Sequence, residues 1–294
     1  MVSDSALSRL LRSRVTKFLG GRSQAQKALR ATLARLREHC SSAVFFGGIL
    51  RDLMVFGPSP WLRDVDIVID DKSMTDVASL LRRYIRRRTR FGGLALNVHG
   101  WRIDLWPLSQ TWAFREHLVK GRDFADLPQT TFLDVEAAAV DVFKTGRARR
   151  IHSHGFFEAL RSRTIDVNLV QNPYPDLCIV RSMLLASRLG FSIGPRLVDY
   201  IVHYSEKYDL EELLEVQRSH YGLVRRSIRD LRFWIRGLRE HHRRSRNDPF
   251  PLPDVEGLQQ DLWASTNWEF AAESLARLKQ DGPSSVARSE VAFD

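Results

Sequence analysis

The sequence predicts an α+β protein in which strands backed by helices precede a mostly helical region. Two observations predict the first part: an apolar run that ends in two glycines, and later runs that alternate acidic and apolar residues. A third observation predicts the second part, because apolar residues recur at helical spacing between Val224 and Leu238. We expect an N-terminal helical extension at 1–37, a head at 38–150, a helical region at 151–245 and a partly disordered segment at 246–294.

A strand, a tight turn and a helix are predicted between residues 43 and 56. The apolar run 43–46 leads into Gly47 and Gly48, and apolar residues then recur at helical spacing at Ile49, Leu50, Leu53 and Met54. Glycines let the backbone approach a ligand closely, and the N–H groups at a helix start favour an anion such as a triphosphate. Gly47 and Gly48 are therefore a candidate phosphate cradle, although two glycines before a helix also form an ordinary turn.

The next predicted strand carries two carboxylates, Asp64 and Asp66, in the alternating run 64–69. Alternation directs both side chains to the same face, roughly 7 Å apart along the strand. Mg²⁺ prefers hard oxygen ligands and leaves places for phosphate oxygens, so the pair suits a metal that faces a triphosphate. A solvent-facing edge strand with acidic residues would give the same pattern.

A hairpin is predicted from Gly93 to Leu108, with its turn near His99 and Gly100 and an acid, Asp104, between apolar neighbours. If the strand of Asp104 lies beside that of Asp64, the two strands bring three carboxylates together. Such a cluster would serve phosphoryl transfer with two metal ions, one activating the attacking hydroxyl and one holding the triphosphate.

These elements resemble the class II branch of the polymerase-beta-like nucleotidyltransferases, which holds bacterial CCA-adding tRNA nucleotidyltransferases and bacterial poly(A) polymerases. The order GGxxRD at 47–52, DxD at 64–66 and a third acidic strand at Asp104 is similar to the family's head, and residues 177–201 look like its neck helix. The resemblance implies a head with a mixed sheet and helices, followed by an all-helical domain. It also implies that Arg51 and Asp52 lie close to the nucleotide, where they could equally cap and orient the turn.

The chain departs from the family where the nucleobase is read. Residues 130–137 stand in place of the family's Arg-Arg-Asp-Phe-Thr-Ile-Asn-Ala, without the basic pair or the Asn. Residues 174–178 replace the family's Glu-Asp-x-x-Arg motif, and only about ninety residues follow the neck. Base selection therefore does not transfer from the family, and ordinary CCA addition is not expected.

Composition suits an enzyme that meets polyanions. The net charge of +10 is carried largely by arginine, which pairs with phosphates bidentately. An arginine stripe is predicted along one helix face as a candidate RNA-binding surface, at Arg225, Arg229, Arg232, Arg236, Arg239 and Arg243. A merely solvated face would have the same pattern.

Cysteine usage and hydropathy predict a cytoplasmic protein without a membrane partner. The two cysteines, Cys40 and Cys178, are too few for a disulfide framework, and no apolar run approaches the roughly 20 residues that cross a bilayer. The Arg- and Ser-rich start is also the composition of a transit peptide, but residues 33–40 run directly into the first strand as a packing helix. The tail from Gly282 is polar and expected to be disordered.

The sequence predicts a metal-dependent nucleotidyltransferase that moves NMP from an NTP to an RNA 3′ end, with tRNA as a candidate acceptor. Asp64 and Asp66 would bind two Mg²⁺ ions, Asp104 would bind the ion that activates the acceptor, and Gly47 and Gly48 would hold the triphosphate. Two alternatives remain open at this point: a nucleotidyltransferase of toxin or defence type that modifies a protein or small molecule, and a catalytically idle RNA-binding adaptor. The oligomeric state is open too.

Overall fold

The structure is a computed structural model that describes residues 3–59, 62, 64–71, 74–89 and 92–253. Its first part is built on a mixed seven-stranded sheet in the order β3-β4-β5-β2-β1-β6-β7. The strands are β1 Ala43–Phe46, β2 Asp64–Ile69, β3 Ile85–Arg88, β4 Leu94–Val98, β5 Trp101–Pro107, β6 Ala138–Asp141 and β7 Ile151–Ser153. Within this sheet β2 and β5 pair in parallel, and the other neighbouring strands are antiparallel.

Alternation along β2 and β5 separates two faces of the sheet. Val65 and Ile67 of β2 and Ile103 of β5 join the main core, whereas Asp66 and Asp104, one residue further along, project from the opposite face. Segment 108–127 packs against this second face at Val44 and Val68, which lie two residues further along the strands than Asp66, and at Phe46, which is the register partner of Asp66. The carboxylates therefore lie where this cover stops, toward the start of β2 and β5.

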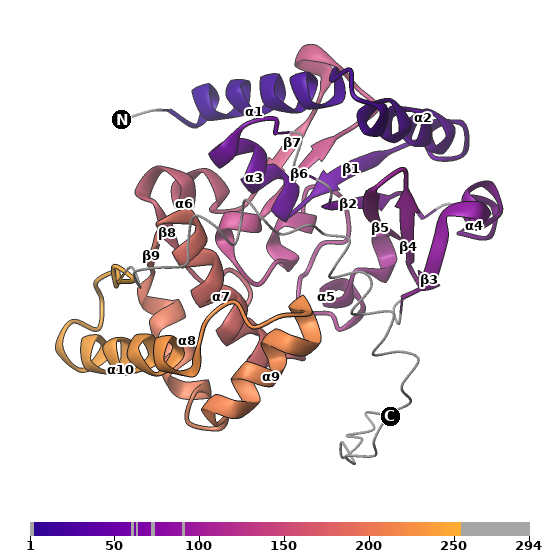
Figure 1. The fold of residues 1–294 in the computed structure, drawn as a ribbon. Coiled ribbons are helices and arrows are strands. Elements are labelled where there is room, and N and C mark those ends of the chain that lie inside the picture. Colours follow the sequence, from indigo (N-terminus) through magenta and orange to yellow (C-terminus); the bar gives the residue numbers. More distant parts are fainter. Residues whose placement is uncertain (1–2, 60–61, 63, 72–73, 90–91, 254–294) are drawn as a thin grey trace, which may run out of the picture.

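Helices α1 (Asp4–Leu19) and α2 (Gln24–His39) cover the apolar face of the sheet (Figure 1). Phe18 of α1 lies edge-on to the fully buried Trp101, with ring centroids 5.5 Å apart, and the Trp101 indole donates to the Ala25 carbonyl of α2. Burying a Phe side chain contributes about 2–3 kcal/mol. Gly20 and Gly21 lie in the break between these two helices, and the N-terminal segment shares its core with the head.

The remaining helices of the head are α3 (Gly48–Phe56), α4 (Met74–Leu81) and α5 (Trp112–Arg115). The predicted hairpin is confirmed, because His99 and Gly100 turn the chain between β4 and β5 with φ values of 48° and 85°. Strand β7 still belongs to the head sheet, one to three residues beyond the boundary predicted at 150.

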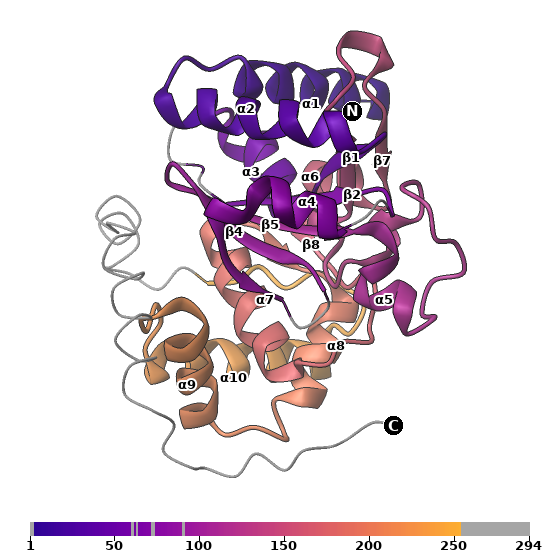
Figure 2. The same cartoon turned by 90° about the vertical axis from the view of Figure 1, so that its right-hand side faces the viewer.

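The second part is helical. Its later helices lie on the side of the sheet away from α1 and α2 (Figure 2), whereas its first helix adds Phe156 and Phe157 to the core under α1. It contains α6 (Phe156–Ser162), α7 (Pro175–Leu189), α8 (Pro195–Tyr204), α9 (Leu210–Tyr221) and α10 (Ile228–Arg244), with a small sheet of β8 (Thr164–Ile165) and β9 (Ser192–Ile193). Helix α10 ends before Pro249, and the Trp234 indole on α10 donates to the Pro253 carbonyl. The expected disordered tail from Gly282 lies outside the described residues.

Among the residues that the structure describes, no helix is long and apolar enough to cross a membrane. Cys40 and Cys178 are both buried, and no disulfide joins them.

Candidate active site

Asp66 and Asp104 lie side by side on the two parallel strands. The register pairs Asp66 of β2 with Asp104 of β5, and Asp64 with Arg102. The same row continues through Phe46 of β1. The strand of Asp104 therefore is the neighbour of the Asp64 strand, which was the condition for bringing the acidic residues together.

Asp64 points to Arg102 instead of closing a cluster of three carboxylates. Its Oδ2 lies 3.0 Å from an Arg102 guanidinium nitrogen, and both side chains are at least half exposed. Among the residues that the structure describes, no three His, Cys, Asp or Glu side chains gather closely enough to hold one ion. The predicted cluster of three is therefore not formed, because Asp64 starts the strand at its exposed end and Arg102 is its register partner.

The electrostatics of Asp66 and Asp104 favour the binding of a cation. Burial raises the pKa of Asp66 to about 8, and the charges of Asp64 and Asp104 add to the shift. Burial and Asp64 also raise the pKa of Asp104. Two carboxylates that resist ionisation together are stabilised as anions when a cation binds between them.

The donor set fits Mg²⁺. Asp66 and Asp104 offer adjacent hard oxygens, and Asp64 is two residues away on the same face. Mg²⁺ commonly takes one or two carboxylates and completes its shell with water and substrate phosphate. Asp64 pairs with Arg102 through Oδ2, which leaves its other oxygen available to the ion.

The glycine turn lies against Asp66. Gly47 precedes α3 with φ 70° and ψ −129°, a conformation that side chains other than glycine rarely adopt, and a Cβ there would sit 3.8 Å from Asp66 Oδ2. The Gly47 N–H donates to the Ala138 carbonyl at 3.1 Å, so in this conformation it holds the sheet rather than a phosphate. The Gly48 N–H begins the helix, where backbone donors have no acceptor within the helix, and is the better placed of the two for an anion.

An ion-pair network that the sequence analysis did not foresee joins this turn to the helical part. Arg51 is buried and pairs with Asp52 at 2.7 Å and with Glu136. Arg181 of α7 donates to both oxygens of Glu136, at 2.8 and 2.9 Å, and Arg188 of α7 pairs with Asp52 at 2.8 Å. The head and the helical part are thus tied together directly behind the turn.

The network keeps its acids ionised. Burial alone would raise the pKa of Glu136, but Arg181 and Arg51 lower it below its ordinary value. Burial would likewise raise the pKa of Asp52, but Arg51 and Arg188 lower it below its ordinary value. Arg51 and Asp52 are therefore held beside the turn by side-chain ion pairs, and their position close to a nucleotide stays a prediction. The signal for Glu136 was its place in the altered stretch 130–137, and that for Arg181 and Arg188 was the neck-like pattern.

The predicted arginine stripe is shorter than expected. Helix α10 begins at Ile228, so Arg225 lies in the preceding loop and not on the helix. Arg239 is half-buried and donates to Ser205, to its carbonyl at 3.1 Å and to its hydroxyl at 3.2 Å. Four of the six arginines remain exposed on α10, namely Arg229, Arg232, Arg236 and Arg243.

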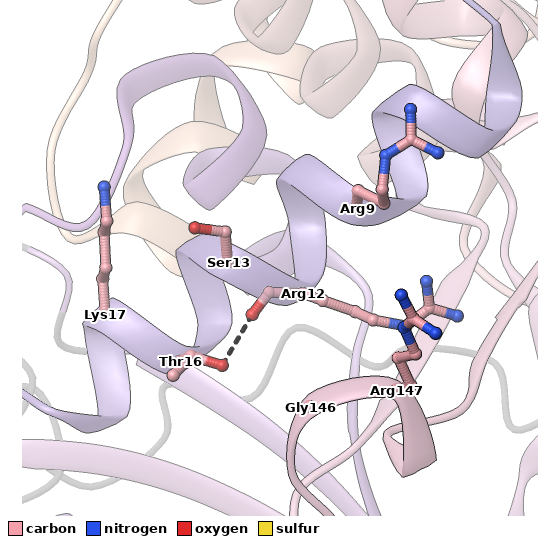
Figure 3. Close-up of a pocket in the computed structure, with 7 residues that line it drawn as sticks. All are labelled: Arg9, Arg12, Ser13, Thr16, Lys17, Gly146 and Arg147. Atoms are coloured by element: carbon pink, nitrogen blue, oxygen red, sulfur yellow. Dashed lines mark hydrogen bonds between the residues drawn. The ribbon is translucent and has the colours of Figure 1, made fainter.

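A separate cationic cavity of about 440 Å³ lies on the exposed side of α1 (Figure 3). It is lined by Arg9, Arg12, Ser13, Thr16, Lys17, Gly146 and Arg147. None of the predicted site residues contributes to this lining, so the cavity is not part of the candidate active site.

No protein-family model matches the chain, and no curated protein matches its sequence. Similar solved structures do exist. The CCA-adding enzyme in its apo form I is 18% identical, with a TM-score of 0.51 over 70% of this chain and 49% of that chain. The Bacillus stearothermophilus CCA-adding enzyme in complex with CTP is 21% identical, with a TM-score of 0.50 over 68% of this chain and 49% of that chain. A tRNA-processing enzyme with CTP is 18% identical, with a TM-score of 0.50 over 70% and 55%.

The chain spans about half the length of these solved structures. At this level of identity the likeness concerns the fold. The mixed seven-stranded sheet and the helices that follow it are therefore the fold of the CCA-adding enzymes.

Proposed function

We propose that this chain is a nucleotidyltransferase that transfers NMP from an NTP to the 3′ hydroxyl of an RNA, with tRNA as the first candidate acceptor. The observation that carries the proposal is the pairing of Asp66 with Asp104 on neighbouring parallel strands, beside a glycine turn that starts a helix. In the reaction the acceptor oxygen bonds to the α-phosphorus, the bond to pyrophosphate breaks, and the hydroxyl proton leaves to solvent.

Each residue of the site has a role that its position supports. Asp66 and Asp104 would hold Mg²⁺, with Asp64 as a further ligand. The Gly48 N–H and the start of α3 would bind phosphate oxygens. Arg51 and Asp52 orient the turn through the ion-pair network with Glu136, Arg181 and Arg188. When bound, Mg²⁺ lowers the pKa of the acceptor hydroxyl and neutralises charge on the triphosphate.

Two further observations support an NTP and an RNA as substrates. Two of the structures similar in fold hold CTP, and one of these two is called a tRNA-processing enzyme. The exposed arginines of α10 present a row of cations of the kind that follows a phosphate backbone. The changes at 130–137 and 174–178 leave the choice of base to residues other than the family's motif.

The test is to incubate the purified chain with each α-labelled NTP, Mg²⁺ and total RNA, and to separate RNA from protein. Label at the 3′ end of RNA is the expected result. Label in protein would redirect the proposal to the toxin or defence type of nucleotidyltransferase. No transfer from any NTP by the folded chain would favour the RNA-binding adaptor.

A further inference from the structure

Tyr221 and Arg225 form a stacked pair between α9 and α10. Helix α9 ends at Tyr221, and Gly222 turns the chain with φ 73°. The guanidinium carbon of Arg225 then lies 4.9 Å from the centroid of the Tyr221 ring. Stacking of this kind sets the plane of the guanidinium group before any ligand arrives.

A buried glutamine fixes the loop that carries Arg225. Gln217 has no exposed surface, and its side-chain oxygen accepts from the backbone N–H groups of Arg225 and Arg226 at 3.0 and 2.9 Å. Its amide nitrogen donates to the Arg226 carbonyl at 3.0 Å. Arg226 in turn donates to Ser187 of α7 at 2.9 Å, so the loop is tied to two helices. Such bonds at a fully buried site cost free energy when they are broken, which holds the loop in one position.

The loop that carries the pair lies against α7 next to Arg188, because Arg226 donates to Ser187 at 2.9 Å. The guanidinium groups of Arg188 and Arg102 lie close enough to act on Arg225: burial and these two like charges lower its pKa, against the opposing effect of Tyr221. Arg102 bridges to Asp64, and Arg188 bridges to Asp52. The loop before α10 therefore brings Arg225 to the part of α7 that Arg188 ties to Asp52, directly behind the glycine turn.

We infer that Arg225, stacked on Tyr221 and positioned by Gln217, binds a phosphate group of the substrate from the helical side of the active site. The inference rests on the proposed function, since it concerns the same site. A concentration of like charge that costs free energy in the folded protein is offset when an anion binds among the arginines. Stacking uses the face of the guanidinium, and phosphate binds through its edge in the bidentate geometry that arginine favours.

The phosphate could come from the triphosphate of the nucleotide or from the backbone of the acceptor RNA, and two binding measurements distinguish these sources. Arg225→Gln and Arg225→Lys variants of the full chain are compared with the wild type for binding of ATP and CTP with Mg²⁺, and separately for binding of bulk tRNA. Arg35→Gln, which removes the same charge from an exposed position on α2, is the matched control.

Arg225→Gln is expected to lower the affinity for one of the two ligands at least tenfold, whereas Arg35→Gln leaves both affinities unchanged. Lys restores only part of the loss, because it keeps the charge without the planar stack. Weaker NTP binding assigns the triphosphate, and weaker tRNA binding with a smaller salt dependence assigns the backbone. Wild-type affinity of Arg225→Gln for both ligands would overturn the inference, as would a wild-type chain that binds neither.

Gln217 is tested as a positioning residue by a double-mutant cycle. Gln217→Leu should lower the affinity for the same ligand as Arg225→Gln does. In a chain that already carries Arg225→Gln, it should cause little further loss of affinity. Full and additive losses in the double variant would contradict positioning through Arg225. If the wild-type chain transferred no NMP but the variants still weakened ligand binding as expected, the result would count against the proposed function alone. Binding is measured without turnover, so it tests the phosphate site independently.

Discussion

Replacing Asp66 by Asn should stabilise the protein while it abolishes transfer. Burial, Asp64 and Asp104 raise the pKa of Asp66 from 3.8 to about 8. Because the folded pKa exceeds the unfolded value, the folded state keeps a proton that the unfolded chain has already released. The stabilising contribution is complete below the unfolded pKa, and it is lost as the pH rises through the folded pKa.

The magnitude follows from the shift. One pKa unit corresponds to about 1.4 kcal/mol, and about three units separate the unfolded pKa from neutral pH, so the loss by pH 7 is at most about 4 kcal/mol. Asn has nearly the same shape and carries no charge at any pH. The free energy of unfolding of Asp66→Asn should therefore exceed that of the wild type by about 1–4 kcal/mol at neutral pH, with little difference near pH 4.

The assay is urea unfolding of both proteins in EDTA across this pH range, followed by circular dichroism. Glu38→Gln, a change at an exposed carboxylate of α2, is the control for a general charge effect. Adding Mg²⁺ should stabilise the wild type and leave Asp66→Asn unchanged, since ligand binding to the folded state raises its stability. Equal pH dependence of the wild type and Asp66→Asn would refute the description of Asp66 as a buried, crowded carboxyl group.

Three further predictions concern the turn, the ion-pair network and α10. Gly47→Ala should weaken NTP binding as well as stability, whereas Gly57→Ala, which has φ 77° and open space around it, should affect stability alone; nucleotide titration and thermal unfolding measure the two effects. Glu136→Gln should cost about 3 kcal/mol of unfolding free energy because it leaves buried Arg51 underpaired, against less than about 1 kcal/mol for Glu158→Gln in an exposed pair; urea unfolding decides. Replacing Arg229, Arg232 and Arg236 together by Gln should lower RNA affinity and its salt dependence without changing NTP affinity, and unchanged RNA binding would contradict the proposed track.

Local patterns predicted the head well. Alternation placed Asp64 and Asp66 on one face, and the turn at His99 and Gly100 set the hairpin, because these features depend on residues close in sequence. The sequence alone did not predict that β2 and β5 are neighbours, on which the meeting of their carboxylates depends. The register of these two strands places Asp104 opposite Asp66. Pairing between distant strands is a tertiary property that no single segment carries.

The parts that were missed depend on tertiary contacts. Helical spacing counted Arg225 into the stripe, but the Gly222 turn and the Ser227 cap start α10 three residues later. The pairing of Asp64 with Arg102 and of Glu136 with Arg181 joins residues that are 38 and 45 positions apart. The register of β2 with β5 fixes the first pair, and the packing of the head on α7 fixes the second, so composition and spacing alone did not predict either pairing.

The central claim is transfer of a nucleotidyl group, and it is tested most directly by following two labels in one reaction. The chain is incubated with Mg²⁺, RNA and an NTP labelled at the α-phosphate in one sample and at the γ-phosphate in another. The account predicts that α label enters RNA while γ label is released as pyrophosphate, one for one, and that Asp66→Asn abolishes both. Transfer of the γ label to RNA, or incorporation that survives in Asp66→Asn, would contradict it.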